Sequence, residues 1–225
     1  MWALLDGAPV LTIPHHPANR SHFYPWEYFH EQFMPVVEIF QDYRGSAEGP
    51  SCPGRSVFPE VDGAEHHVQA ALARGLRLGF IAGGDHGGVA QAGLFVRRLD
   101  RAGVLEALCA RRVFGTTGIH CWLTFAVNGR VLGGEVTDAG SGTVEVELGC
   151  AAPEPVADAV LVINGREEAI PVAPGRRAWR WGGAVRVPST VARPGYVYPR
   201  IRFCNGEIAW GSPVWVAAAG GGQSG

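Results

Sequence analysis

The chain has 225 residues, which suffices for one large domain or two small ones, and 47% of them are hydrophobic. The formal net charge is -2 and every basic residue is arginine, so the chain lacks the basic patch that binding to nucleic acid or to an anionic membrane requires. No apolar run approaches the roughly 20 residues that span a bilayer. The first residues show no signal-peptide pattern, and five widely spaced cysteines favour reduced thiols, so we expect a cytoplasmic protein.

Three short apolar runs in the first half are typical of buried strands. They span residues 9–13, 36–40 and 78–82. The pattern predicts a helix over 64–74, with Asp62 as its N-cap, and a second helix over 100–112. Because strands alternate with helices, this half favours a parallel α/β sheet. Functional residues in such sheets gather at the carboxyl ends of the strands.

The apolar period changes to two from about Trp122. Alternating runs occupy residues 143–148, 160–163 and 196–203, and Asn-Gly turn signals stand at 128–129, 164–165 and 205–206. This pattern predicts a small antiparallel β-sandwich. We therefore expect an α/β domain over 1–120, a β-sandwich-like domain over 121–217 and a disordered tail over 218–225.

The histidines gather in the first half, where all eight lie within the first 120 residues. His15 and His16 follow the first apolar run, and Asp85 and His86 follow the third, between two glycine pairs. Imidazole and carboxylate are the ligands of borderline divalent metals, so both motifs predict metal ligands. The alternative for the second motif is a tight turn with a surface histidine. Since adjacent side chains diverge, we expect His16, or else His15, to point into the site.

Two glutamates are further candidates for the site. Glu38 lies inside an apolar strand, where a carboxylate is costly unless it is paired or coordinated, so an active-site role and a structural role both remain open. Glu48 lies in the Gly-, Pro- and Ser-rich segment 45–63, whose length predicts an active-site lid. We expect Glu48 to project into the same cleft.

These motifs together resemble the PHP superfamily (polymerase and histidinol phosphatase), specifically its DUF3604 branch. The segments that carry the resemblance are 13–17, 37–39, 45–48, 77–86, 106–118, 196–202 and 209–215. The resemblance implies part of a distorted (β/α)7 barrel with two or three divalent metal ions at the carboxyl ends of its strands. It also implies a C-terminal β appendage, which matches the two-residue period.

The resemblance further implies a function. It is metal-dependent hydrolysis of a small-molecule phosphate ester, with zinc, manganese or iron as the cofactor. His16, Asp85 and His86 would be ligands, and Glu38 or Glu48 would orient a ligand or accept a proton.

Two departures from the family pattern carry their own expectations. The chain has no His-x-His strand, so we expect it to be the C-terminal part of a longer protein, completed by a missing N-terminal half-barrel or by a partner chain. Asp85 and His86 are adjacent, so both can bind one metal only if their turn is irregular. The alternative is a catalytically inactive remnant whose β-sandwich serves as an interaction module.

Overall fold

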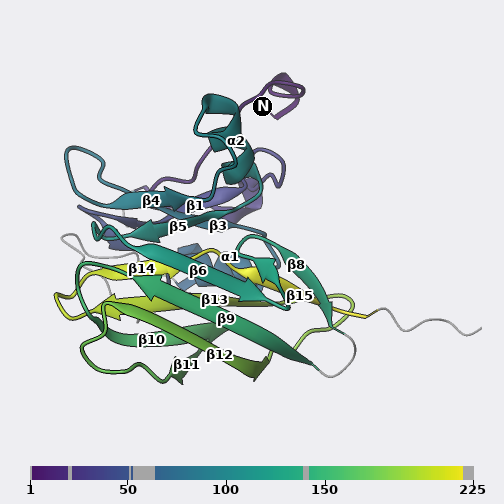
Figure 1. Ribbon diagram of the computed structural model, residues 1–225. Coiled ribbons are helices and arrows are strands. Elements are labelled where there is room, and N and C mark those ends of the chain that lie inside the picture. Colours follow the sequence, from purple (N-terminus) through teal and green to yellow (C-terminus); the bar gives the residue numbers. More distant parts are fainter. Residues whose placement is uncertain (1, 20–21, 51, 53–63, 139–141, 220–225) are drawn as a thin grey trace, which may run out of the picture.

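The computed structural model describes residues 2–19, 22–50, 52, 64–138 and 142–219 (Figure 1). Three stacked β-sheets form the framework of this part of the chain. The expected cap Asp62, most of the expected lid 45–63 and most of the expected tail 218–225 lie outside the described residues.

The smallest sheet contains the predicted parallel pair. Its order is β2-β1-β3, formed by β1 (Val36–Gln41), β2 (Gly45–Ser46) and β3 (Gly79–Gly83). Strands β1 and β3 are parallel, and helix α1 (Val68–Ala73) lies between them in the chain after a 3-10 turn, η3 (Ala64–His66). The strands expected at 36–40 and 78–82 are therefore confirmed. The apolar run 9–13 forms no strand; Thr12 donates its backbone N–H to the Phe33 carbonyl at 2.7 Å.

The central sheet has eight strands in the order β11-β10-β13-β14-β5-β4, with β15 on β13 and β8 on β15. Its members are β4 (Gln91–Leu94), β5 (Val113–Thr116), β8 (Glu135–Asp138), β10 (Val156–Ile163), β11 (Arg166–Ile170), β13 (Gly195–Phe203), β14 (Ile208–Gly211) and β15 (Val214–Ala218). Strand β5 pairs with β14, so this sheet crosses the domain boundary expected at 120/121.

The outer sheet has the order β12-β9-β6-β7. Its members are β6 (Trp122–Val127), β7 (Arg130–Val131), β9 (Thr143–Ala151) and β12 (Ala178–Arg186). The turn between β6 and β7 has positive φ at Asn128 (45°) and Gly129 (74°), as an Asn-Gly hairpin requires. The sandwich expected for this half is present in part, because the outer sheet packs on a central sheet that also contains β4 and β5 of the first half.

The central sheet is covered on both faces, and β13 shows how. Val197 and Ile201 enter the core shared with the outer sheet, whereas Tyr196 and Tyr198 enter the core shared with β1 and β3. Since successive side chains point to opposite faces, one alternating strand supplies both cores. Figure 1 shows the resulting stack, with β1 and β3 above the green strands β9 and β12.

The expected (β/α)7 barrel is wrong. The described residues contain two α-helices, α1 and α2 (Arg101–Cys109), together with short 3-10 turns η1 (Trp2–Leu4), η2 (Trp26–Tyr28) and η3. A parallel barrel needs a crossover helix after every strand, but β4 and β5 are antiparallel and continue into the later strands. The parallel α/β arrangement is therefore limited in the first half to β1 and β3. Of the helices described, none is long and apolar enough to cross a membrane.

A glycine allows the first sheet to approach the central one closely. A Cβ atom on Gly115 of β5 would lie 2.9 Å from the backbone carbon of Ile81 and 3.0 Å from the backbone nitrogen of Ala82, both on β3. Real Cβ atoms do not approach backbone so closely. The carboxyl end of β3, just before Asp85, therefore packs directly against the central sheet.

Candidate active site

The parallel pairing of β1 and β3 brings the two predicted motifs together. Glu38 stands in β1 opposite Ile81 of β3, and Asp85 follows the end of β3. The segment containing His15 and His16 runs beside β1, because the backbone N–H of Glu38 donates to the Pro14 carbonyl at 3.2 Å. Residues from three separate parts of the chain therefore meet at one end of this small sheet.

A chain of short contacts connects these residues. His15 Nδ1 lies 2.8 Å from Glu38 Oε2, and His15 Nε2 lies 3.7 Å from Asp85 Oδ1. His86 Nε2 lies 3.6 Å from the same Asp85 oxygen. The structure therefore brings His15, Asp85 and His86 together, whereas the sequence favoured His16 over His15 as the histidine that points into the site. His16 reaches this cluster through its backbone N–H, which donates to Glu38.

The turns that form the cluster have unusual backbones. His16 (φ 33°) and Asp85 (φ 48°) both lie in the left-handed region, which non-glycine residues seldom adopt. This supplies the irregular turn that adjacent Asp85 and His86 need in order to face one point. Such conformations cost free energy and are concentrated at functional sites, which favours a functional site here.

Glu38 is the buried member of the cluster, with 6% of its surface exposed. Its Oε2 accepts the backbone N–H of His16 at 2.7 Å. A Cβ atom on Gly83 would lie 2.7 Å from Glu38 Oε1, so that glycine leaves room for the carboxylate. Burial raises the pKa of Glu38, and Asp85 adds to the shift, while the His16 amide and His15 oppose it. Glu38 is thus held firmly against His15.

His16 lies beside this contact and differs from His15 in its environment. Burial lowers the pKa of His16, and the neighbouring His15 lowers it further, so the neutral imidazole is favoured. The two rings lie 4.0 Å apart between centroids. Within the described residues, His16 Nδ1 is buried and has no hydrogen-bond partner.

Two residues that the sequence prediction missed hold the Asp85 loop in place. Asp42 Oδ2 accepts the backbone N–H of Ala90 at 2.7 Å, and Tyr43 Oη donates to the His86 carbonyl at 3.1 Å. Both residues come directly after β1, and the carboxyl end of a parallel strand was the signal that could have identified them.

Glu48 lies in a different environment from the one expected. Its carboxylate is fully buried and accepts hydrogen bonds from Tyr198 Oη (2.7 Å), Trp210 Nε1 (2.7 Å) and Arg200 Nη1 (3.0 Å to each oxygen). Burial lowers the pKa of Arg200, but Glu48 and Glu167 outweigh that effect and raise it, so the guanidinium stays charged. Glu48 therefore joins the segment after β1 to the central sheet, and its oxygens are occupied by these donors.

The donor set can be tested for a metal ion. In the described ranges, no group of three or more His, Cys, Asp or Glu side chains is preformed as a metal site. Bond lengths of 2.0–2.1 Å at a tetrahedral zinc ion place its ligand atoms about 3.4 Å apart. The 3.6 and 3.7 Å separations around Asp85 Oδ1 are slightly longer, and the His86 side chain, 86% exposed, is free to turn inward. These side chains would therefore have to move before all three could bind one ion, and a second ion would need further donors.

The surroundings of His15 match a recurrent feature of metal sites. A ligating histidine usually donates its other ring N–H to a carboxylate, which sets the tautomer and aims the free nitrogen. Here Glu38 faces Nδ1, which leaves Nε2 to face Asp85.

Comparisons with known proteins give relatives but no activity. No family model matches the chain. Uncharacterized proteins of Chlamydia trachomatis and Chlamydia muridarum are each 24% identical, and one of Chlamydia pneumoniae is 25% identical. Each alignment covers 92% of this chain but 38% of the relative, so the chain spans well under half the length of these curated relatives. A crystal structure of an engineered protein matches with a TM-score of 0.26 and 14% identity, over 44% of this chain and 20% of that one, which is too low to compare folds.

Proposed function

We propose that the Asp85 end of β3 binds one divalent metal ion and hydrolyses a small-molecule phosphate ester. The observation that carries this proposal is the convergence of His15 Nε2 and His86 Nε2 on one Asp85 oxygen, at 3.7 and 3.6 Å. Two imidazoles and a carboxylate leave one position open for water on a tetrahedral ion, as in catalytic zinc sites. Zinc, manganese and iron all accept such donors.

The residues around the proposed ligands have distinct roles. Glu38 is a positioning residue, because it holds His15 Nδ1 and is itself held by the His16 amide. A bound divalent ion would lower the pKa of a water molecule and stabilise negative charge on the phosphoryl oxygens. We assign proton transfer to His16, whose neutral ring has an Nδ1 atom without a partner in the described part of the chain. The exposed His86 leaves the site open to a substrate from solution.

The test is metal content by elemental analysis after stripping with chelator and separate reloading with zinc, manganese or iron(II). We expect one ion per wild-type chain and loss of the ion in Asp85→Ala. Glu38→Gln should weaken metal affinity about 10- to 100-fold, the usual effect of removing a carboxylate behind a ligating histidine. His120→Ala is the matched control, because the His120 ring lies 2.9 Å from Gln91 Nε2 and outside the cluster. Hydrolysis of p-nitrophenyl phosphate should follow metal content across these variants.

A second function, that of a non-catalytic interaction module, is favoured by one observation. No group of three or more potential ligands is preformed in the described ranges. If wild-type protein keeps none of the three metals, the hydrolase proposal fails for this chain. The curated relatives are longer than this chain, so ligands supplied by another segment or chain should also be tested. Metal reloading should therefore be repeated after the protein is mixed with cell extract, where a partner chain that completes the ligand set would restore metal uptake.

A further inference from the structure

A trough on the outer sheet lies apart from the site described above. One hollow of about 510 Å³ lies along β6, β9 and β12, beside Phe95. A second hollow of about 370 Å³ shares Thr124, Gly149 and Arg180 with the first. The first falls within the 300–1,000 Å³ range of small-molecule sites, and the two together form an elongated surface.

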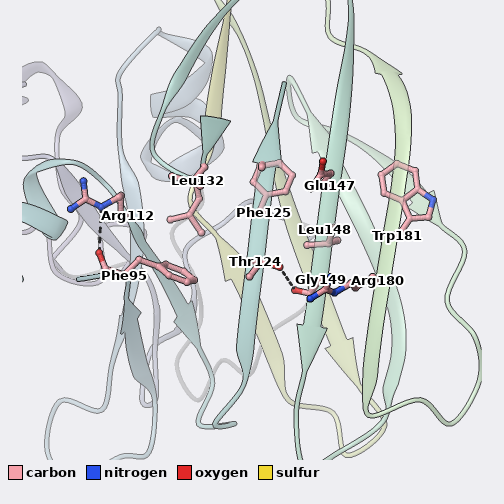
Figure 2. A pocket seen from close by; sticks show the side chains of 12 residues that line it. Phe95, Arg112, Thr124, Phe125, Leu132, Glu147, Leu148, Gly149, Arg180 and Trp181 are labelled. Atoms are coloured by element: carbon pink, nitrogen blue, oxygen red, sulfur yellow. Dashed lines mark hydrogen bonds between the residues drawn. The ribbon is translucent and has the colours of Figure 1, made fainter. Parts of the chain in front are cut away.

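Strand register explains why this face is hollow. Thr124, Gly149 and Arg180 form one row across β6, β9 and β12, and Trp122, Ala151 and Ala178 form the next. The intervening residues on these strands point inward to the core, and apart from Trp122 and Arg180 these two outward rows carry small side chains. Gly149 is central, because a Cβ atom there would lie 2.6 Å from Thr124 Oγ1 and 3.6 Å from Arg180 Cγ. Figure 2 shows Arg180 lying across β9 at Gly149.

Aromatic side chains border the trough. Trp122 is 62% exposed and packs edge-on against Phe95, with ring centroids 5.4 Å apart. Phe95 is itself fixed, because its backbone N–H donates to the Arg112 carbonyl and the Arg112 guanidinium Nε donates to the Phe95 carbonyl (Figure 2). A large exposed indole on a floor of alanine and glycine offers a flat apolar platform.

The charges of the trough are balanced and unsatisfied. Arg180 and Glu147, both exposed, have no ion pair or side-chain hydrogen bond to any described residue. Arg112, by contrast, is already paired with Glu106. A ligand here therefore meets one strong donor group and one strong acceptor group, with no net charge. This favours a neutral molecule that carries both donors and acceptors over an organic anion.

We infer that this trough binds a neutral carbohydrate chain. Sugar rings present C–H groups on one face, which stack on an indole, and hydroxyl groups at the edge, which donate to a carboxylate and accept from a guanidinium. The open, elongated shape suits several linked rings, whereas an apolar small molecule is normally enclosed over most of its surface.

The experiment is native electrophoresis of the full chain in gels that contain xylan, mixed-linkage β-glucan, galactomannan or amylopectin. We expect at least one polysaccharide to retard the wild-type protein. Trp122→Ala and Arg180→Gln should each weaken that binding about tenfold or more. Arg186→Gln is the matched control and should bind like wild type, because Arg186 is exposed on the same face of β12 but outside the two hollows.

Three outcomes would overturn the inference. The first is no retardation by any of the four polysaccharides. The second is equal retardation of all variants that keep the wild-type melting temperature. The third is that 2-naphthoate binds, as measured by quenching of tryptophan fluorescence, while no polysaccharide binds. That result would assign the first hollow to an apolar anion. Metal content at Asp85 takes no part in this test, so it succeeds or fails independently of the hydrolase proposal.

Discussion

Removal of the Glu48 carboxylate should destabilise the whole protein rather than a local loop. Glu48 is fully buried, and Tyr198, Trp210 and Arg200 all direct donors at it from the central sheet. Glu48→Ala would leave the charge of Arg200, itself 7% exposed, without its buried partner. Breaking a buried pair in this way costs about 3–5 kcal/mol. For a chain of this size that corresponds to a fall in melting temperature of roughly 6–20 °C.

The assay is urea unfolding monitored by tryptophan fluorescence, to which all seven tryptophans, Trp210 among them, contribute. Glu167→Ala is the control, because Glu167 pairs with the same Arg200 at 2.6 Å from a position that is 45% exposed. Such a partly exposed pair should contribute about 1 kcal/mol or less. A free energy of unfolding for Glu48→Ala within about 1 kcal/mol of wild type would refute the reasoning.

Two further predictions concern the sheet contact and alkaline pH. Gly115→Ala should destabilise the fold by about 1–3 kcal/mol, because the added Cβ would press on the backbone of Ile81 and Ala82. Gly182→Ala is the control and should change stability little, because a Cβ there would lie 3.7 Å from its nearest neighbouring atom. Equal melting temperatures for the two variants would contradict this prediction. Burial raises the pKa of Tyr196 to about 12 from its ordinary 10.0. The unfolded state therefore loses the phenolic proton first, and stability should fall as pH rises from 10 toward 12. Tyr196→Phe should lessen that fall in unfolding experiments between pH 9 and 12, and an unchanged pH profile would count against it.

Local elements could be predicted because their signals are local. The Asn164-Gly165 turn adopts positive φ at both residues, 50° and 83°, as its composition requires. The helix expected over 100–112 is α2, which begins where the Asp100 carboxylate accepts the Gly103 N–H at 2.8 Å. Parallel strands at 36–40 and 78–82 followed from two apolar runs separated by a helical segment.

The cluster at Asp85 was partly predictable, and the environment of Glu48 was not. Asp85, His86 and one histidine of the 15–16 pair were expected together because each motif follows a presumed strand. His16 was favoured, but the structure places His15 against Asp85, and the run before these histidines forms no strand. Glu48 was expected in a cleft because its segment reads as a loop. Its partners, Tyr198 and Arg200, stand about 150 residues further along the chain, and no local pattern connects them.

Sequence patterns marked the strands near 36–40, 78–82, 143–148, 160–163 and 196–203, the Asn-Gly turns, and the histidines and carboxylates that meet beside β1. They did not mark β4 or β12, and the run 9–13 was wrongly expected to be a strand. The pairing of the strands, by contrast, depends on contacts between distant parts of the chain. Strands β4 and β5 lie in the first half, where strands alternate with helical segments as in a parallel α/β fold. They nevertheless pair antiparallel with each other, and β5 pairs antiparallel with β14, which excludes the barrel. An apolar run specifies burial but not a pairing partner, because a strand edge can form its hydrogen bonds with a parallel or an antiparallel neighbour at only slightly different stability. Packing across both faces of the central sheet selects between them.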